Sequence, residues 1–304
     1  MNRRGFVTIA TGQTRYYQMA ANLLASYRLF CSDDTPFAII CDQICEYTQG
    51  FDDIIVVQSM RGSYIDKLYL WQYSPYEETI FVDADSLFFS DPKLLWDDFE
   101  FMGDVSAYGQ VLPLSSAKSW FSYEHAGEFK PFLKFGIGMH GGVYYFRKTY
   151  DAERVFERAI MLAENYAQYR FAHFYKPADE PVLALSMAVS GYKPCEAKMK
   201  VLFLPSYEGK LKIGRNGQLR IEGKPSEAII LHVGSSNTCR FVYRYLSQFV
   251  HNQGNALSRT EYWKMKVQCF PDDILRPLRR TIMRTIKYLL PEGLRKKVYL
   301  LRHN

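Results

Sequence analysis

The stretch Thr79-Ile-Phe-Val-Asp-Ala-Asp-Ser-Leu-Phe-Phe-Ser-Asp-Pro92 places two carboxylates, Asp83 and Asp85, between two very hydrophobic runs. The apolar residues before Asp83 predict a buried strand, and strand side chains alternate, so both carboxylates are expected to point the same way. In an open parallel sheet, ligands collect beyond the carboxyl ends of the strands. Two carboxylates beside apolar neighbours are costly unless a proton or a cation compensates their charge. The stretch therefore indicates a divalent metal site that can bridge to a diphosphate.

The segments around this stretch alternate between continuous apolar runs and helical periodicity. This alternation predicts an α/β fold with a mainly parallel central sheet and flanking helices. After the two carboxylates this alternation is less regular, and an irregular aromatic insert is expected over 106–134. A helix is expected at 180–189, with Pro181 at its start and Asp179 as its cap. Strands are expected at 6–10, 36–41, 54–57, 79–82, 142–146, 202–205, 219–222 and 229–232, and the other helices at 16–30, 65–73, 92–99 and 151–169.

Length and composition bound the class of protein. With 304 residues, 48% of them hydrophobic, the chain can bury a sizeable core. It contains no run of about 18 uncharged apolar residues and no signal-peptide core, so we expect it to stay in the cytoplasm. Six scattered cysteines, of which only Cys41 and Cys45 are close, indicate reduced thiols rather than a zinc site.

Basic charge is concentrated at the C-terminus. Residues 274–304 hold nine Lys and Arg against one acid, a net +8, so the first 273 residues carry −2 of the total +6. This distribution gives no support for a nucleic-acid surface on the main domain. Apolar and cationic side chains of the segment fall on separate helical stripes, which is typical of a helix lying on an anionic membrane. We therefore expect a catalytic domain over 1–254 and a peripheral-membrane tail over 255–304.

Two enzyme classes place Asp-x-Asp directly after a buried strand. In haloacid-dehalogenase-like phosphatases the first aspartate, here Asp83, is the phosphoryl-accepting nucleophile. In nucleotide-sugar transferases the pair holds a metal on the diphosphate of the donor. The motif alone fits both classes, so the rest of the sequence has to decide between them.

Further segments occur in a fixed order around the carboxylates. They are Gly5-Phe-Val-Thr-Ile-Ala-Thr11, Asp66-Lys67-Leu68 with Trp71, His140-Gly-Gly-Val-Tyr-Tyr-Phe146, Asp179-Glu180 and Ile229-Ile-Leu-His232. Together with Phe81-Val-Asp-Ala-Asp-Ser-Leu87, they resemble the family 8 glycosyltransferases, the glycogenin-like and lipooligosaccharide-galactosyltransferase group with a GT-A fold. The resemblance covers roughly residues 5–240.

The resemblance implies a donor, the stereochemistry of the reaction and a set of site residues. It implies transfer of a sugar from uridine diphosphate to a glycan or lipid-linked acceptor, with retention at the anomeric carbon. It implies a metal on Asp83, Asp85 and His232, and the imidazole among the oxygens favours Mn²⁺ over Mg²⁺. Donor contacts are implied for Ile9, Thr11, Tyr16, Lys67, Ala84, Gly141, Gly142 and Gly234.

The sequence departs from the family pattern at two places. The family's His-x-x-Gly-x-x-Lys has no lysine here, because Thr238 stands in that register and Gly234 comes one residue early, which leaves Arg240 as a substitute for diphosphate binding. Glu180 stands where the family has glutamine. A glutamate there can act as a covalent nucleophile, with Asp179 bonded to sugar hydroxyls and Lys67 adding fixed positive charge. A helix cap remains an alternative role for Glu180.

These departures also keep a third hypothesis open. A chain with a decayed site would bind a sugar nucleotide or a glycan without turning it over. The sequence specifies neither the donor sugar, nor the acceptor, nor the oligomeric state.

Overall fold

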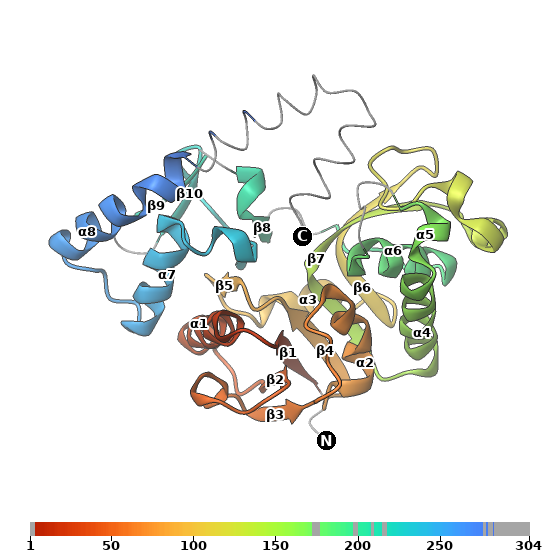
Figure 1. The fold of residues 1–304 in the computed structure, drawn as a ribbon, viewed down its shortest axis with the longest axis horizontal. Helices are drawn as coiled ribbons and strands as arrows, with labels where there is room; N and C mark the ends of the chain where they lie inside the picture. The colour runs from red at the N-terminus through yellow and green to blue at the C-terminus, as the bar shows by residue number, and fades with distance from the viewer. Residues whose placement is uncertain are drawn as a thin grey trace. The chain divides into compact units, whose positions relative to one another are not determined.

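A computed structural model describes residues 4–171, 177–196, 200–207, 210–214, 218–275, 278 and 282 (Figure 1). Its strands are β1 Arg4–Ala10, β2 Phe37–Cys41, β3 Asp53–Val56, β4 Glu78–Val82, β5 Ser86–Phe88, β6 Val105–Leu112, β7 Gly136–Arg147, β8 Val201–Phe203, β9 Leu211–Ile213, β10 Leu219–Ile221, β11 Lys224–Pro225 and β12 Ile230–His232. Its α-helices are α1 Thr14–Phe30, α2 Leu70–Tyr73, α3 Leu94–Phe99, α4 Tyr150–Glu164, α5 Tyr166–Tyr169, α6 Asp179–Val189, α7 Phe241–His251 and α8 Arg259–Phe270. Short 3₁₀ turns include η2 Tyr64–Tyr69.

Six strands form the main sheet in the order β3-β2-β1-β4-β7-β6. Strands β1 to β4 run parallel, and β7 pairs antiparallel with both β4 and β6. The strand order reverses between β1 and β4, because β1 continues to β2 on one side while β4 lies on the other. The carboxyl ends of β1 and β4 therefore flank the position where open α/β sheets bind ligands.

A second, three-stranded sheet has the order β5-β12-β8. Strand β5 begins one residue after Asp85, and β12 pairs antiparallel with it, so that His232 lies opposite Ser86. The N–H of Val233 also donates to the carbonyl of Asp85 at 3.0 Å. This register brings the end of β12 to the end of β4, although the two strands are far apart in the sequence.

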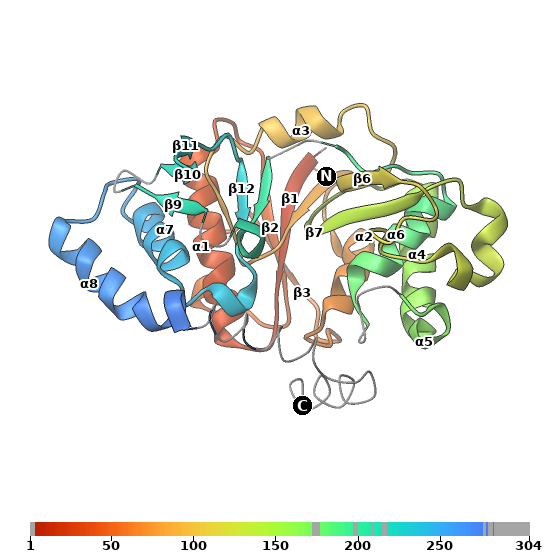
Figure 2. The same ribbon diagram turned by 90° about the horizontal axis from the view of Figure 1, so that it is seen from above.

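Apolar side chains pack on both faces of the main sheet. Helix α1 lies on one side of β1, and α4 with α6 lies on the other side in both views (Figures 1 and 2). Helix α1 buries Tyr17, Leu23 and Tyr27, and every residue of α6 from Val182 to Ala188 is buried. Helices buried on almost all sides need an apolar sequence throughout, which is what α6 has.

The α/β fold with a mainly parallel sheet and flanking helices is confirmed. None of the six cysteines, all of which lie among the described residues, forms a disulfide. The prediction of an irregular insert over 106–134 is wrong in its first part, because Val105–Leu112 forms β6. The prediction that Asp179 caps a helix is also wrong: Ala178 is at the N-cap, and Asp179 is the first helical residue. Asp83 to Asp85 form a turn rather than a strand, closed by the N–H of Ser86 bonding to the carbonyl of Asp83 at 3.0 Å.

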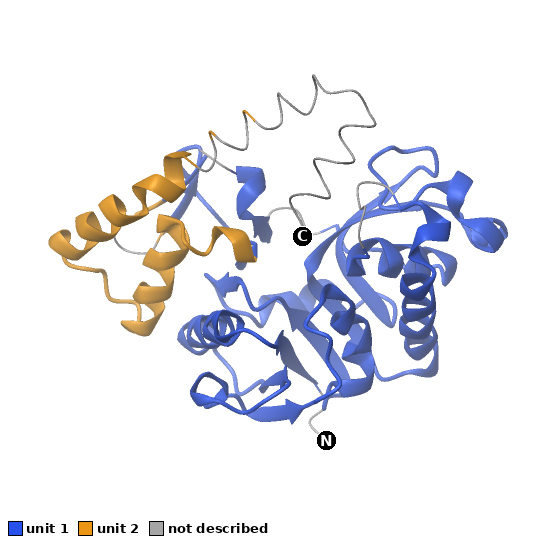
Figure 3. Cartoon of the chain, in the orientation of Figure 1, with its two compact units in different colours: residues 1–212, 219–234 blue, residues 213–218, 235–304 orange. Residues whose placement is uncertain are grey.

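The chain divides into two compact units (Figure 3). Unit 1 comprises residues 1–212 and 219–234, and unit 2 comprises 213–218 and 235–304. Unit 2 contains α7 and α8, whose inner faces meet through ring contacts of Tyr262 with Phe241 and Tyr245. Helix α8 begins with a capping box between Ser258 and Glu261. Among the described residues, no helix is long and apolar enough to cross a membrane.

The predicted division into a catalytic domain over 1–254 and a tail over 255–304 stays a prediction. Most of the basic segment 274–304 lies outside the described residues. Four apolar side chains at its start are described, and each is about half exposed: Ile274, Leu275, Leu278 and Ile282.

Candidate active site

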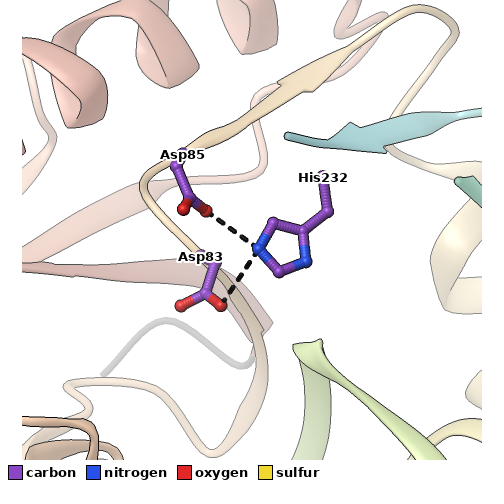
Figure 4. Close-up of side chains that lie close together, drawn as sticks. All are labelled: Asp83, Asp85 and His232. Atoms are coloured by element: carbon purple, nitrogen blue, oxygen red, sulfur yellow. Dashed lines mark ion pairs between the residues drawn. The ribbon is translucent and has the colours of Figure 1, made fainter. Parts of the chain in front are cut away.

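Asp83, Asp85 and His232 converge at the carboxyl end of β4 (Figure 4). Nε2 of His232 lies 3.0 Å from Oδ1 of Asp85 and 3.6 Å from Oδ2 of Asp83. One possible ligand atom from each of the three residues lies within 4.8 Å of the others. The turn at 83–85 points both carboxylates toward the imidazole of His232. The register of β12 against β5 places His232 at this position.

Lys67 joins this cluster to the start of α6. Its Nζ lies 2.9 Å from Oδ2 of Asp83 and 3.4 Å from Oδ2 of Asp179, and it donates to the carbonyl of Gly141 at 3.3 Å. Its side chain is only 13% exposed. The pKa of Lys67 is raised despite burial, because Asp179 and Asp83 favour the charged ammonium. The lysine is therefore a fixed cation between two carboxylates.

Asp179 and Glu180 begin α6 and face β7. Oδ2 of Asp179 accepts the hydroxyl proton of Tyr144, and Oε1 of Glu180 accepts from the N–H of Gly141 at 2.8 Å. Burial and the neighbouring Asp179 raise the pKa of Glu180 to about 7. The carboxyl group of Glu180 thus changes charge near neutral pH.

The glycine pair of β7 leaves room for side chains of the site. A Cβ on Gly141 would lie 2.4 Å from Cγ of Glu180, and one on Gly142 would lie 2.6 Å from Nδ1 of His232. Both glycines were predicted as donor contacts because of their backbone. The structure adds a steric reason for glycine at each position.

Buried charges in the cluster balance one another. Burial raises the pKa of Asp83, with Lys67 opposing that rise. Burial also acts to raise the pKa of Asp85, but His232 outweighs it and the pKa is lowered. The pKa of His232 is raised in spite of burial, because both carboxylates stabilise its charged form. Each group is therefore sensitive to positive charge placed among the three.

The residues fit a divalent cation. Oδ1 of Asp85 is buried and makes no hydrogen bond of good geometry, but it pairs with Nε2 of His232 at 3.0 Å, so a divalent cation would replace the imidazole proton as its partner. Two carboxylates and one imidazole form a mixed oxygen and nitrogen donor set of the kind that Mn²⁺ accepts more readily than Mg²⁺. Asp83, Asp85 and His232 would hold the metal.

The predicted donor contacts of the first strand lie at the end of β1, beside the switch point. Ile9 and Thr11 are half-buried, and Tyr16 follows in the first turn of α1. The hydroxyl of Tyr16 accepts from Arg15 at 2.8 Å, and the Arg15 guanidinium lies 4.7 Å from its ring centre. Ala84 is buried in the turn between the two carboxylates.

Gly234 and Arg240 fall on different sides of the division between units. Gly234 ends unit 1 in a left-handed conformation with φ of 76°, which favours glycine. Arg240 belongs to unit 2, where its Nε lies 3.3 Å from Oδ1 of Asp273. The structure therefore gives Arg240 a partner within its own unit, and a role at the diphosphate stays a prediction.

Two polar residues of the site were not identified from the sequence. Tyr144 is fully buried and bonded to Asp179, and its place on the same face of β7 as Gly142 was the available signal. His140 lies 3.2 Å from His232, nitrogen to nitrogen. Its partner is distant in the sequence, so alternation along β7 could not reveal the contact.

The fold is that of a GT-A-like protein. No protein-family model matches the chain, and no curated protein matches it by sequence. Among solved structures, the bifunctional glycosyltransferase WbbM matches 88% of this chain with a TM-score of 0.51 and 12% identity. At that identity the likeness shows the fold alone, and the match covers 52% of the WbbM chain, about half its length.

Two further solved structures are similar at lower TM-scores. Mouse xyloside xylosyltransferase 1 matches 77% of this chain and 99% of its own, with a TM-score of 0.47 and 11% identity. The galactosyltransferase LgtC, solved with donor and acceptor sugar analogues, matches 86% of this chain and 99% of its own, with a TM-score of 0.48 and 13% identity.

Proposed function

We propose that this protein is a metal-dependent glycosyltransferase that moves a hexosyl group from a nucleoside-diphosphate sugar, with uridine diphosphate as carrier, to a glycan or lipid-linked acceptor. The observation that carries the proposal is the convergence of Asp83, Asp85 and His232 at the switch point of a GT-A-like sheet. His232 beside the two aspartates is a feature that the glycosyltransferase hypothesis predicts and the phosphatase hypothesis does not.

The reaction breaks the bond between the anomeric carbon and a diphosphate oxygen, and the electron pair leaves with the diphosphate. A divalent metal bound to Asp83, Asp85 and His232 would supply Lewis-acid stabilisation of that leaving group. Lys67 adds a buried positive charge that is already in place before the reaction begins, so it needs no reorganisation. Its bonds to Asp83 and Asp179 fix the ammonium on the side of the cluster that faces α6.

Glu180 is the proposed catalytic carboxylate near the sugar. The resemblance implies retention, and a carboxylate close to the anomeric carbon can form a glycosyl ester that the acceptor hydroxyl then displaces. Asp179, held by Tyr144 and Lys67, is proposed to bond sugar hydroxyls. The start of α6 would therefore present both carboxyl groups to the donor sugar.

Release of nucleoside diphosphate from a panel of nucleotide sugars, with Mn²⁺ and with EDTA, tests the proposed function. We expect turnover of one donor in Mn²⁺ and none in EDTA. Metal-dependent binding of a donor without turnover, even with acceptors supplied, would favour the non-catalytic binder. Phosphate release from simple esters through an acyl-phosphate on Asp83 would support the phosphatase instead.

The raised pKa of Glu180 predicts a pH dependence. If the carboxylate form is the active one, kcat/KM rises about tenfold per pH unit below 7 and levels off above it, because kcat/KM reports the pKa of the free enzyme. The rising limb near pH 7 should be absent from the pH profile of Glu180→Gln. A wild-type profile of kcat/KM that is flat from about pH 5.5 to about pH 8.5 would contradict an ionising role for Glu180.

The raised pKa of Glu180 also makes the stability of the fold depend on pH, in the direction opposite to the activity. The folded protein binds the Glu180 proton more tightly than the unfolded chain, since the pKa rises from 4.5 to about 7. Its contribution is therefore fully present below pH 4.5 and is lost as the pH rises through about 7. Activity that needs the Glu180 carboxylate therefore rises over the same pH range in which the contribution of Glu180 to the free energy of unfolding falls.

We also propose that residues 274–304 bind an anionic membrane surface, which would place the protein on the cytoplasmic face of a membrane. Exposed apolar side chains on α8 and beyond it support this proposal, because they recur at helical spacing beside Lys264 and Lys266. They are Trp263, Val267, Phe270, Ile274, Leu278 and Ile282.

Charge removal in this segment should weaken vesicle binding. At about 1 kcal/mol per cation, changing Arg276, Arg279 and Arg280 to glutamine is expected to reduce binding to phosphatidylserine vesicles roughly 100-fold. Co-sedimentation measures the effect. The matched control changes the exposed Lys93, Lys118 and Lys134 to glutamine and loses the same charge outside the segment. An equal loss in the control would mean that the segment has no special role.

A further inference from the structure

Tyr64 is an exposed aromatic residue beside the buried cation of the candidate site. It is the first residue of η2, and 65% of it is exposed. Nζ of Lys67 lies 6.0 Å from the centre of its ring. The ring of Phe81, whose centre is 5.5 Å from the same Nζ, is fully buried. Of these two rings beside the ammonium, Tyr64 is therefore the one that a ligand arriving from solvent can reach.

The turn before Tyr64 is held in shape by one buried carboxylate. The side chain of Asp66 accepts from the N–H of Arg61 and from the N–H of Ser63, each at 3.0 Å. Oγ of Ser63 accepts from the N–H of Ile65 at 3.3 Å. The ring of Tyr64 is thus presented by a preorganised turn, so a ligand that binds to it pays little for ordering the chain.

This turn adjoins both the end of β1 and the candidate metal site. A Cβ on Gly62 would lie 4.0 Å from Oγ1 of Thr11, which follows β1. Partial burial raises the pKa of Tyr64, Lys67 opposes that rise, and Tyr16 is among the groups that add to it. The Tyr64 hydroxyl is therefore within electrostatic reach of both Lys67 and Tyr16, in the first turn of α1.

The order of the strands indicates which part of a donor would meet this ring. The candidate metal site lies at the end of β4, and the carboxyl groups proposed to face the sugar bond to β7 on one side of it. Strand β1 borders β4 on the other side. With the diphosphate on the metal and the sugar toward β7, the nucleoside of a bound donor extends toward β1, where the turn of Tyr64 adjoins Thr11.

We propose that Tyr64 is a further donor-binding residue, whose ring packs against the nucleoside of the nucleoside-diphosphate sugar. Tyrosine offers a large and rigid contact surface at a low cost in conformational entropy, and bases of any sequence stack on aromatic rings. The ring of Tyr16 already has the Arg15 guanidinium 4.7 Å from its centre, whereas Tyr64 is largely exposed. The inference rests on the proposed function and adds to it a residue for the nucleoside.

Binding of uridine diphosphate to the full-length protein in excess Mn²⁺, measured by calorimetry, tests this role. Tyr64→Leu keeps an apolar side chain but removes the ring, and it should weaken binding roughly 10-fold to 100-fold, the effect of losing one base–aromatic stack. Tyr64→Phe should stay within about threefold of wild type, because the ring is kept. Binding of methyl diphosphate, measured by its displacement of uridine diphosphate, should be unchanged in both variants, since methyl diphosphate has no nucleoside.

Tyr150→Leu is the matched control. Tyr150 is 71% exposed, and the Arg154 guanidinium lies 5.8 Å from its ring centre, so it is also an exposed tyrosine beside a cation. It follows Arg147, which pairs with Glu78 at the start of β4, whereas the candidate metal site lies at the end of that strand. The change there should leave the affinity for uridine diphosphate at the wild-type level.

The outcomes separate this inference from the proposed function. The expected result is a loss of affinity for uridine diphosphate in Tyr64→Leu that Tyr64→Phe restores and that methyl diphosphate does not share. Unchanged affinity in Tyr64→Leu would overturn the inference and leave the proposed function standing. An equal loss for methyl diphosphate would also overturn it, because Tyr64 would then act through Lys67 and not on the nucleoside. Absence of uridine diphosphate binding in wild type would overturn the proposed function itself.

Discussion

Replacing Asp85 by asparagine is expected to lower nucleoside-diphosphate release roughly 1000-fold, the size of effect seen when a preorganised electrostatic group is lost from an active site. The change keeps the shape of the side chain but removes the charge of a buried carboxylate whose Oδ1 lies 3.0 Å from Nε2 of His232. It should also weaken Mn²⁺ binding by more than about 100-fold, since even changes outside the ligand set cost 10-fold to 100-fold. Calorimetry with Mn²⁺ and a diphosphate-release assay measure the two effects.

Asp97→Asn is the matched control for this experiment. Asp97 lies in the exposed part of α3, and the same change there removes the same charge without touching the cluster. It should leave Mn²⁺ affinity and turnover at the wild-type level. Retention of Mn²⁺ binding by Asp85→Asn would remove Asp85 from the ligand set, and full activity without Mn²⁺ binding would refute metal dependence.

The parallel part of the sheet could be predicted because its signals are local. Strands β1, β2 and β4 are apolar runs buried on both faces along most of their length, which is distinct from the periodicity of α1, and the edge strand β3 is apolar but only partly buried. Strands β6 and β7 were harder to recognise, since Gly136-Ile-Gly-Met-His-Gly-Gly142 has the composition of a loop. Glycine is needed there for close approach: a Cβ on Gly109 of β6 would lie 2.4 Å from the carbonyl oxygen of Gly138.

The candidate site was only partly predictable from the residues. The pairing of two carboxylates after a buried strand indicated a cation, but the turn at 83–85 depends on one hydrogen bond, from Ser86 to Asp83, that alternation does not encode. The position of His232 depends on the register of β12 against β5, a contact between distant segments, and only the family resemblance pointed to it. The contact of His140 with His232 depends on that same register, so it became visible only in three dimensions.

Replacing Lys67 by methionine is expected to destabilise the metal-free protein by about 3–5 kcal/mol, the cost typical of removing one partner from a buried ion pair. The change leaves Asp83 and Asp179 without the ammonium that lies 2.9 Å and 3.4 Å from their Oδ2 atoms. Because the pKa of Lys67 is raised, its charge is complete below its ordinary value of 10.5, so its full contribution is present at pH 8. Urea denaturation in EDTA at pH 8 measures the difference.

Lys210→Met provides the control, because its ion pair with Glu222 has the same 2.9 Å separation but both side chains are about 60% exposed. No measurable change is expected there. The loss of unfolding free energy that Lys67→Met causes, relative to wild type, should become smaller as the pH falls toward about 5. Asp83 without its lysine takes up a proton at a higher pH, and protonation removes its uncompensated charge. Added Mn²⁺ should also recover stability, since a cation then returns beside Asp83. A deficit that neither acid nor Mn²⁺ reduces would mean that Lys67 acts by packing rather than by charge.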